Sequence, residues 1–244
     1  MTQALPPPDP SRAVVVVPTY NEMEMLLRIS EAVLALKGWR LLVVDDNSPD
    51  GTGQLADEIA GREPRVSVLH RAAKEGLGPA YLAGFAECLK RPDVEFVFEM
   101  DADFSHDPAD LPRLLEAARD ADLVIGSRYV RGGRTEGWGL RRRLLSQWGN
   151  VYVRLVLGIP VRDATAGFRC WRRRALEAVD FSAVSAKGYG FQIEMAYRTV
   201  KAGFRVIEVP ICFAERRAGK SKMSGSIVTE ALALPWRLRR IGIR

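Results

Sequence analysis

Two aspartates stand two positions apart at the end of an apolar stretch. The segment FVFEMDADFSHDP (96–108) passes from a strand-like sequence into Asp101, Asp103 and Asp107. In extended geometry Asp101 and Asp103 share a face, and carboxylates this close repel each other unless a cation lies between them. Mg²⁺ and Mn²⁺ bind one or two such carboxylates together with water and substrate phosphates. The pair predicts a divalent metal site with Ser105 as third neighbour, whereas Asp107 is interpreted as a helix N-cap.

The sequence around this pair alternates between strands and helices. Apolar runs of strand length are separated by stretches with helical spacing, and they occupy 13–18, 40–46, 65–70, 94–101 and 121–128. Strands that are apolar on both faces and alternate with helices predict an α/β fold, with a parallel sheet covered on both sides. Ligands of such sheets bind beyond the carboxyl ends of the strands. We therefore expect PTYNE, DDNSPDGTG, DADFSH and GSRYVRGG to lie along one edge.

The segment DDNSPDGTG allows two interpretations. Its Asp, Asn, Ser, Pro and Gly residues all favour turns, so it can be a turn without further function. Its first two residues, Asp45 and Asp46, stand directly at a strand end. A carboxylate there can accept hydrogen bonds from the N–H edge of a nucleobase.

Length and composition indicate one folded domain. The 244 residues are 47% hydrophobic and 27% charged, which suits a single α/β domain that we place at 13–225. Residues 1–12, with four prolines, predict a disordered tail. No stretch is long and apolar enough for a membrane span. Three distant cysteines without a CxxC motif favour a reducing compartment over a zinc or disulfide framework.

Basic residues are clustered rather than spread. Residues 128–143 hold six arginines and one acid, and the last thirty residues hold eight bases and two acids. Such clusters suit phosphate, nucleic acid or an anionic membrane surface, although a solvated basic face is the simpler alternative. The segment 137–158 mixes arginines with Leu, Trp and Val, which favours a membrane surface over an ordinary core helix. We expect 226–244 to be a basic amphipathic tail that contacts a membrane or a partner.

Several function classes lack their motifs. No G-x-G-x-x-G follows the first strand, which disfavours nicotinamide and flavin enzymes, and no P-loop is present. Two histidines and no G-x-S-x-G give a hydrolase triad little support. A nucleic-acid-binding module is disfavoured because no recognition motif stands out and the acidic strand ends would repel a phosphate backbone.

Eight segments together resemble one known family. In order they are VVPTYNE, VVDDNSPDGTG, EGLGPAYLAGF, MDADFSHDP, GSRYVRGG, GFRCWRRRAL, KGYGFQIEM and ERRAGKSKM. They resemble the dolichol-phosphate mannose synthases and the bacterial polyprenyl-phosphate mannosyltransferases, which are family 2 glycosyltransferases with the Rossmann-like GT-A fold. The resemblance covers about residues 13 to 225. A D-x-D motif alone is weak, but its combination with DDNSPDGTG and KGYGFQIEM is specific.

For the donor, the resemblance implies roles that can be placed residue by residue. Asp46 matches the acid that contacts the base, and Asp101 and Asp103 match the pair that holds the diphosphate through Mg²⁺ or Mn²⁺. Ser105 stands where some members carry a glutamine ligand. The remaining donor positions are Pro18, Tyr20 and Glu22 around the nucleoside, and Arg216 and Lys222 in a basic segment that closes over the donor.

For the acceptor, the resemblance implies binding of its phosphate and the transferred sugar by Arg128, Arg142 and Ser146. Gln192 belongs to the loop and helix near the acceptor. The positions predicted to be catalytic are Asp103, Arg128, Arg142 and Arg216.

The implied reaction is inverting transfer of mannose from GDP-mannose to a polyprenyl phosphate. A related alternative uses UDP-glucose or another nucleotide sugar, because one aspartate does not separate guanine from uracil. Many family members continue into membrane-spanning helices, which this sequence lacks. The resemblance therefore implies a peripheral enzyme on the cytoplasmic face of the membrane, with an anionic surface and a separate integral membrane protein as partners and no nucleic acid.

Overall fold

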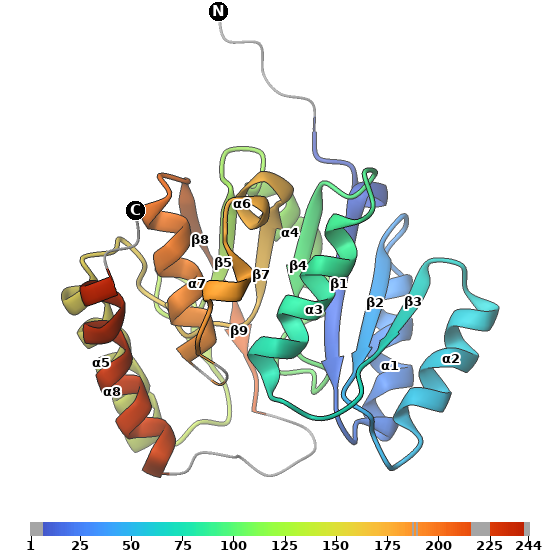
Figure 1. Cartoon of the computed structure of the whole chain (residues 1–244), viewed down its shortest axis with the longest axis horizontal. Coiled ribbons are helices and arrows are strands. Elements are labelled where there is room, and N and C mark those ends of the chain that lie inside the picture. The colour runs from blue at the N-terminus through green and yellow to red at the C-terminus, as the bar shows by residue number, and fades with distance from the viewer. Residues whose placement is uncertain (1–6, 187, 189, 216–224, 242–244) are drawn as a thin grey trace, which may run out of the picture.

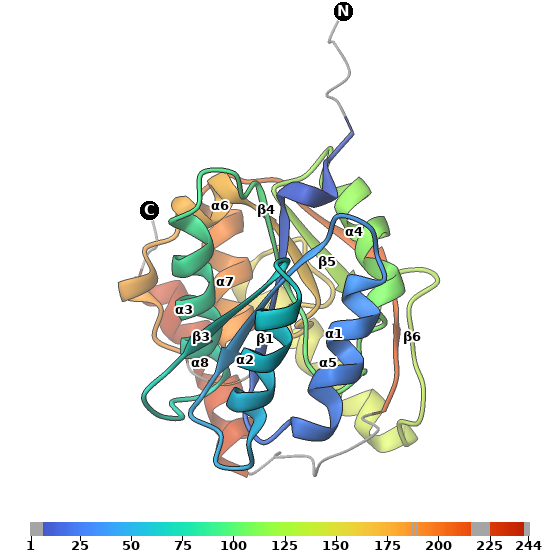
Figure 2. The same cartoon turned by 90° about the vertical axis from the view of Figure 1, so that its right-hand side faces the viewer.

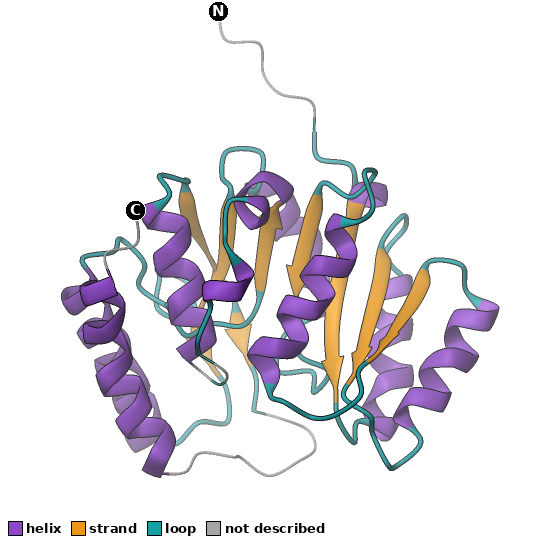
Figure 3. Ribbon diagram, viewed as in Figure 1, coloured by secondary structure: helices purple, strands orange, loops and turns teal. Residues whose placement is uncertain are grey.

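A twisted sheet between two layers of helices forms the centre of the molecule (Figures 1 and 3). The computed structural model describes residues 7–186, 188, 190–215 and 225–241, and for residues 225–231 it describes the backbone alone. The sheet order is β3-β2-β1-β4-β7-β5-β8. The strands are β1 (Ala13–Thr19), β2 (Arg40–Asp45), β3 (Val66–His70), β4 (Phe96–Glu99), β5 (Leu123–Ser127), β7 (Arg169–Arg172) and β8 (Val206–Pro210).

All neighbouring strands pair in parallel except β7, which is antiparallel to both β4 and β5. The expected mostly parallel sheet is confirmed. Two shorter strands, β6 (Arg134–Thr135) and β9 (Cys212–Phe213), form a separate parallel pair. This small pair ties the turn after β5 to the segment after β8.

Helices cover both faces of the sheet, as Figure 2 shows from the side. One layer contains α1 (Met23–Leu34), α2 (Thr52–Arg62) and α4 (Leu111–Ala117). The other contains α3 (Leu77–Leu89), α5 (Leu140–Leu157), α6 (Arg173–Glu177), α7 (Gly190–Lys201) and α8 (Gly225–Ile241). Successive residues of a strand point to opposite faces, so Val14 and Val16 pack into the second layer while Val15 and Val17 pack into the first.

Local sequence explains where several helical segments begin and end. Asp107 accepts a 2.9 Å hydrogen bond from the backbone N–H of Ala109 and thereby caps a 3₁₀ turn, Pro108–Asp110, that leads into α4. The expectation that Asp107 is an N-cap is confirmed. Gly158 is the C-cap of helix α5, and its positive φ of 64° suits glycine. The N–H of Gly158 donates to the carbonyl of Arg154 at 2.9 Å.

Both ends of the described chain are joined to this domain. Residues Pro10–Arg12 form a 3₁₀ turn capped by Asp9, while residues 1–6 of the predicted disordered tail lie outside the described residues. Helix α8 packs against α5 and α7, and its Leu234 and Leu238 are buried in the core. A further 3₁₀ turn, Phe181–Ala183, precedes α7. None of the helices in the described residues is long and apolar enough to cross a membrane.

The sheet brings the predicted site segments to one edge. Thr19, the last residue of β1, is in register with Asp45, the last residue of β2. Val16 of β1 is in register with Glu99, the last residue of β4. Because β1, β2, β4 and β5 all run in the same direction, the residues that follow them emerge on the same side.

Candidate active site

The loops after β1 and β2 are hydrogen-bonded to each other. The backbone N–H of Asn21 donates to Ser48 Oγ, and that of Glu22 donates to Thr52 Oγ1, each at 3.1 Å. Buried Asp45 accepts from Thr19 Oγ1 at 3.0 Å and from Ser48 Oγ at 2.6 Å. Asp45 therefore holds the loops after β1 and β2 together through its buried carboxylate.

Asp46 forms an ion pair with Arg71, which follows β3. Both side chains are about nine-tenths buried, at 7% and 10% exposure. Burial raises the pKa of Asp46, and the positive charge of Arg71 works against this rise. Arg71 also pairs with Glu75. Arg71 was not among the predicted site residues, and its only signal in the sequence is that a charged residue directly follows a strand that ends at the same sheet edge.

Tyr20 lies near this pair and carries a cation on its ring. Lys74 Nζ stands 3.5 Å from the ring centroid. Pro18 is the next-to-last residue of β1, in register with Val44, and Glu22 immediately precedes α1. The four positions predicted for the nucleoside thus come from two adjacent strand ends.

The carboxylates of Asp101 and Asp103 lie in the loop after β4. Tyr81 of α3 donates its hydroxyl to Asp101 Oδ1 at 3.3 Å, and the backbone N–H of Ser105 donates to Asp103 Oδ1 at 3.0 Å. Asp103 is buried, at 6% exposure. Burial, together with the nearby carboxylates, holds the pKa of the Tyr81 hydroxyl well above its usual range, so Tyr81 stays a hydrogen-bond donor.

These residues have the donor chemistry that a divalent cation needs. Oxygen atoms of Asp101, Asp103 and Ser105 are hard ligands, and Ser105 Oγ is a buried atom that has no hydrogen-bond partner among the described residues. Within the described residues, no group of three or more His, Cys, Asp or Glu side chains could hold a metal. Two carboxylates and a hydroxyl suit an ion that completes its coordination with water and substrate phosphates.

A buried polar network stands behind the aspartates. Glu99 of β4 is fully buried, and it accepts hydrogen bonds from Trp171 Nε1 at 2.6 Å and from Gln192 Nε2. Burial raises the pKa of Glu99 to about 7, while the neighbouring Arg169 guanidinium works against the rise. Gln192 directs its amide nitrogen to Glu99, and its buried oxygen Oε1 has no hydrogen-bond partner within the part of the chain that the structure describes.

Arg128 is held by a buried acid. Its Nε and Nη2 donate to the two carboxylate oxygens of Asp163 at 2.8 and 2.5 Å, and Nη2 also donates to Thr165 Oγ1 at 2.7 Å. Asp163 was not among the predicted site residues, and the only sequence signal is an acid in a loop before β7.

Arg142 and Arg128 both lie close to the indole ring of Trp138. The guanidinium carbon of Arg142 is 4.0 Å from the centroid of Trp138, and that of Arg128 is 5.5 Å from the same ring. Arg142 also pairs with Glu215 at 3.1 Å, and Ser146 accepts a 2.6 Å hydrogen bond from the Tyr129 hydroxyl. The structure thus brings Arg128 and Arg142 together.

Phe213 connects this pair to the aspartate loop. Its ring centroid is 5.3 Å from that of His106 and 5.4 Å from the guanidinium carbon of Arg128. The backbone N–H of Ala214 donates to the carbonyl of Ser105 at 3.2 Å. An acidic centre and a cationic centre are therefore neighbours around one aromatic ring. Arg216 and Lys222, which were predicted to close over the donor, lie outside the described residues.

Two curated proteins are similar to almost the whole chain. An undecaprenyl-phosphate mannosyltransferase from Micrococcus luteus is 51% identical over 222 residues, which are 91% of each chain. A polyprenol monophosphomannose synthase from Mycolicibacterium smegmatis is 53% identical over 224 residues, which are 91% of this chain and 84% of that protein.

Solved structures share the fold at low sequence identity. A glucosyl-3-phosphoglycerate synthase from Mycobacterium tuberculosis, in complex with Mn²⁺, UDP-glucose and phosphoglyceric acid, has a TM-score of 0.67 at 20% identity and covers 95% of this chain and 80% of its own. A mannosyltransferase from Pyrobaculum calidifontis, in complex with GDP-mannose and Mn²⁺, has a TM-score of 0.56 at 19% identity. The match covers 88% of this chain and 60% of that protein's chain. The fold is therefore that of the GT-A glycosyltransferases, as expected.

The family comparison agrees with the acidic strand end and the sheet topology. The family model described as glycosyl transferase family 2 matches residues 14–180, which include β1 except its first residue, the aspartate pair and β7. The chain belongs to glycosyl transferase family 2.

Proposed function

We propose that the protein transfers mannose from GDP-mannose to a polyprenyl phosphate and releases GDP. The observation that carries the proposal is that Phe213 contacts both His106, in the loop of Asp101 and Asp103, and Arg128, which shares the Trp138 ring with Arg142. Such an arrangement offers separate places for a donor diphosphate and an acceptor phosphate. The names of the relatives that are 51% and 53% identical support mannose as the sugar and a polyprenyl phosphate as the acceptor.

The donor nucleoside would lie between the ends of β1 and β2. Asp46 would accept hydrogen bonds from the N–H edge of guanine, and Tyr20 would offer its ring beside Pro18 and Glu22. Lys74 over Tyr20 and Arg71 beside Asp46 add positive charge around the proposed nucleoside site. Arg216 and Lys222, which come after β9 in the sequence, would add contacts to the donor, as the family resemblance implies.

Asp101, Asp103 and Ser105 would hold Mg²⁺ or Mn²⁺ at the donor diphosphate. When bound, the ion neutralises the diphosphate and stabilises the negative charge that grows on departing GDP. Tyr81 keeps Asp101 oriented through its hydroxyl, and the Ser105 N–H does the same for Asp103. The protein's part is thus to fix two carboxylates in a partly dry site.

In the chemical step an oxygen of the acceptor phosphate would attack the anomeric carbon of mannose. The bond from that carbon to the GDP oxygen breaks, and the anomeric centre inverts. A phosphate monoester has a second pKa of about 6 and is mostly dianionic at neutral pH, so no strong general base is needed. Arg142 would bind the acceptor phosphate directly with Ser146, while Arg128 shares its donors with Asp163.

Exposed apolar side chains on α5 and α8 support a place at the membrane surface. The two helices pack against each other, and among their described side chains the exposed large apolar ones are Leu140, Leu144, Leu145, Trp148, Val151, Leu155, Leu232, Trp236 and Ile241. Arginines stand among them, which suits an anionic surface. We therefore propose a peripheral enzyme on the cytoplasmic face of the membrane, with a separate integral membrane protein as a further partner.

Transfer of labelled mannose from GDP-mannose to a short polyprenyl phosphate in detergent tests the proposal. We expect turnover with Mg²⁺ or Mn²⁺ and its loss with excess chelator, with UDP-glucose offered in parallel as the competing donor. Glucose transfer from UDP-glucose without mannose transfer would favour the alternative donor. Absence of transfer from both would refute the proposed reaction.

A further inference from the structure

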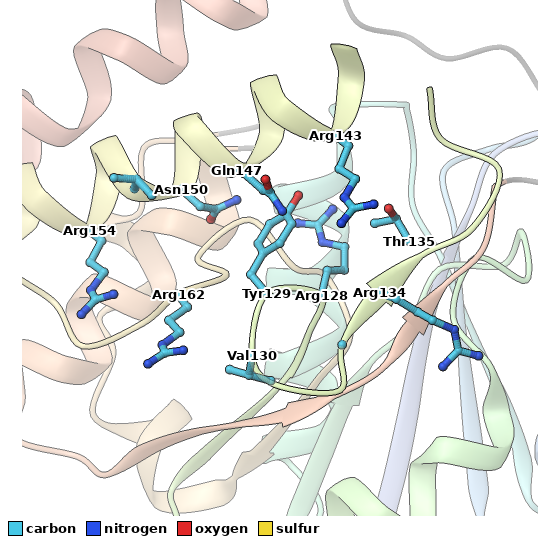
Figure 4. A pocket seen from close by; sticks show the side chains of 12 residues that line it. Arg128, Tyr129, Val130, Arg134, Thr135, Arg143, Gln147, Asn150, Arg154 and Arg162 are labelled. Atoms are coloured by element: carbon cyan, nitrogen blue, oxygen red, sulfur yellow. The ribbon is translucent and has the colours of Figure 1, made fainter. Parts of the chain in front are cut away.

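Beside Arg142 and Ser146 lies a pocket of which the proposed reaction involves only one lining residue, Arg128. Its volume is about 440 Å³, within the range of small-molecule sites. Its lining comes from the turn after β5, from one side of α5 and from the segment after α5: Arg128, Tyr129, Val130, Gly133, Arg134, Thr135, Arg143, Gln147, Asn150, Val151, Arg154 and Arg162. Figure 4 shows these residues around the pocket.

The lining contains five arginines and no acid. Arg128 is paired with Asp163 and Arg134 with Glu136. No carboxylate of the described residues forms an ion pair with Arg143, Arg154 or Arg162. In Figure 4, Arg154 and Arg162 extend on the same side of the pocket, and Arg143 enters from the other side of Tyr129. Three cations that share a pocket repel each other, and an anion among them removes this repulsion.

The pocket shares with the proposed acceptor site only Arg128, which is paired with Asp163. Arg142 and Ser146 do not line it, although they are on the same helix. Tyr129 stands between the two places, because its side chain lines the pocket while its hydroxyl donates to Ser146 Oγ at 2.6 Å. An anion bound by Arg154 and Arg162 would therefore leave Arg142 available for the acceptor phosphate.

An exposed apolar stripe runs along the pocket. Leu144, Trp148, Val151 and Leu155 follow at helical spacing on α5 and are 46–74% exposed. Arg143, Gln147 and Arg154 each stand one position before a member of this stripe, and Val151 belongs to both the stripe and the lining. A ligand that fits both features carries a phosphate at one end and a hydrocarbon chain at the other.

We propose that this pocket binds the headgroup phosphate of an anionic phospholipid, distinct from the polyprenyl phosphate acceptor. The lipid's chains would lie against the α5 stripe while Arg143, Arg154 and Arg162 bind the phosphate oxygens. This inference rests on the proposed function in one respect, namely that α5 faces the membrane. Such a lipid would fix the rotation of α5 on the surface and hold the acceptor arginines at the membrane.

Vesicle flotation tests the inference with a charge-matched control. The test variant is Arg154→Gln/Arg162→Gln, and the control is Lys37→Gln/Arg62→Gln, which removes the same charge from exposed positions near α1 and α2 on the other side of the sheet. With phosphatidylcholine vesicles that contain 30% phosphatidylglycerol, we expect the test variant to bind about tenfold more weakly than wild type. The control should stay within about twofold, and all proteins should bind pure phosphatidylcholine equally. Equal losses in the two variants, or no preference of wild type for phosphatidylglycerol, would overturn the inference.

Titration with short-chain dihexanoyl phosphatidylglycerol and with inorganic phosphate separates a lipid site from a free-anion site. We expect the lipid to bind wild type more tightly than inorganic phosphate does, and the test variant to lose this difference. Equal binding of both ligands to wild type would show a free-anion site and contradict the lipid assignment. Mannose transfer in detergent, measured on the same variants, should stay within about twofold of wild type. Absence of mannose transfer by wild type would instead count against the proposed reaction and would not affect the conclusion about lipid binding.

Discussion

Arg128 and Asp163 form a buried ion pair with two parallel hydrogen bonds, from Nε to Oδ2 at 2.8 Å and from Nη2 to Oδ1 at 2.5 Å. The side chains are 7% and 0% exposed. The backbone N–H of Arg128 donates to the same carboxylate at 2.8 Å. The pair thus joins the turn after β5 to the loop before β7, so Arg128 stabilises the fold whatever else it binds. Arg142, whose pair with Glu215 is partly exposed, has no comparable role.

Truncation of the two arginines should separate stability from catalysis. Arg128→Ala leaves the Asp163 carboxylate buried without its main partner, which we expect to lower the free energy of unfolding by about 3–5 kcal/mol. Arg142→Ala should lower it by no more than about 1 kcal/mol, because its ion pair is solvent-exposed. Instead, Arg142→Ala should raise KM for the lipid phosphate by about tenfold or more.

Urea unfolding followed by circular dichroism gives the first quantity, and steady-state mannose transfer gives the second. Asp163→Asn serves as the matched variant, since it removes the charge but keeps the shape of the partner. Similar unfolding midpoints for Arg128→Ala and Arg142→Ala would show that the ion pair does not stabilise the fold.

Removal of one carboxylate from the predicted metal pair should abolish turnover. In Asp103→Asn the loop keeps its size, but an anionic ligand of the divalent cation is lost. We expect kcat to fall by about 100-fold or more, because metal stabilisation of the leaving group contributes several kcal/mol. Asp57→Asn, which changes an exposed aspartate of α2, is the control and should keep full activity.

Calorimetric titration of Mn²⁺ in the presence of GDP provides a readout that does not depend on turnover. Wild type and Asp57→Asn should bind the ion, and Asp103→Asn should bind it much more weakly. Unchanged Mn²⁺ affinity in Asp103→Asn would place the metal elsewhere.

The close packing of α3 on the sheet leaves no room for a side chain at Gly84. A Cβ at Gly84 would stand 2.5 Å from Val16 Cγ1 and 3.1 Å from Val44 Cγ2, so the helix or the strands must shift. We expect Gly84→Ala to destabilise the protein by about 1–3 kcal/mol. Gly61 of α2 has nothing within 4 Å of such a Cβ, and Gly61→Ala should be neutral or stabilise by up to about 1 kcal/mol. Thermal unfolding of both variants checks the pair, and equal shifts would contradict the packing argument.

Much of the fold follows from local sequence patterns. The apolar runs mark the strands, and Asp107 before Pro108 marks the start of the turn into α4, because these signals act over a few residues. The antiparallel direction of β7 does not follow from the sequence, since a buried strand has the same apolar pattern in either direction. The insertion of β7 between β4 and β5 is a property of the assembled sheet.

Some features of the candidate site can also be predicted from the sequence, and others cannot. The spacing of Asp101 and Asp103 shows in the sequence, whereas the partners that orient the site come from distant positions. Glu99 is 72 positions from Trp171, and Arg128 is 35 positions from Asp163. In a single sequence, a charged residue that is exposed to solvent cannot be told from one that forms a buried ion pair. For that reason, Arg71 and Asp163 were not predicted.

The buried Glu99 should make stability depend on pH in a specific direction. Its pKa is raised from 4.5 to about 7 by burial, so the folded protein binds this proton more tightly than the unfolded chain does. The stabilisation is therefore fully present below about pH 4.5 and is lost as the pH rises through about 7. In the presence of a chelator, we expect the free energy of unfolding to fall by up to about 3 kcal/mol from this group between about pH 5 and pH 8.

Comparison of wild type with Glu99→Gln isolates this contribution, because glutamine keeps the shape and does not titrate. Urea unfolding at half-unit pH intervals should show that the stability of wild type declines relative to that of Glu99→Gln as the pH rises. Glu58→Gln, at an exposed position of α2, is the control and should parallel wild type. Parallel curves for wild type and Glu99→Gln across this range would mean that Glu99 stays ionised in the folded protein. The positive charge of Arg169, rather than burial, would then dominate the environment behind the aspartate pair.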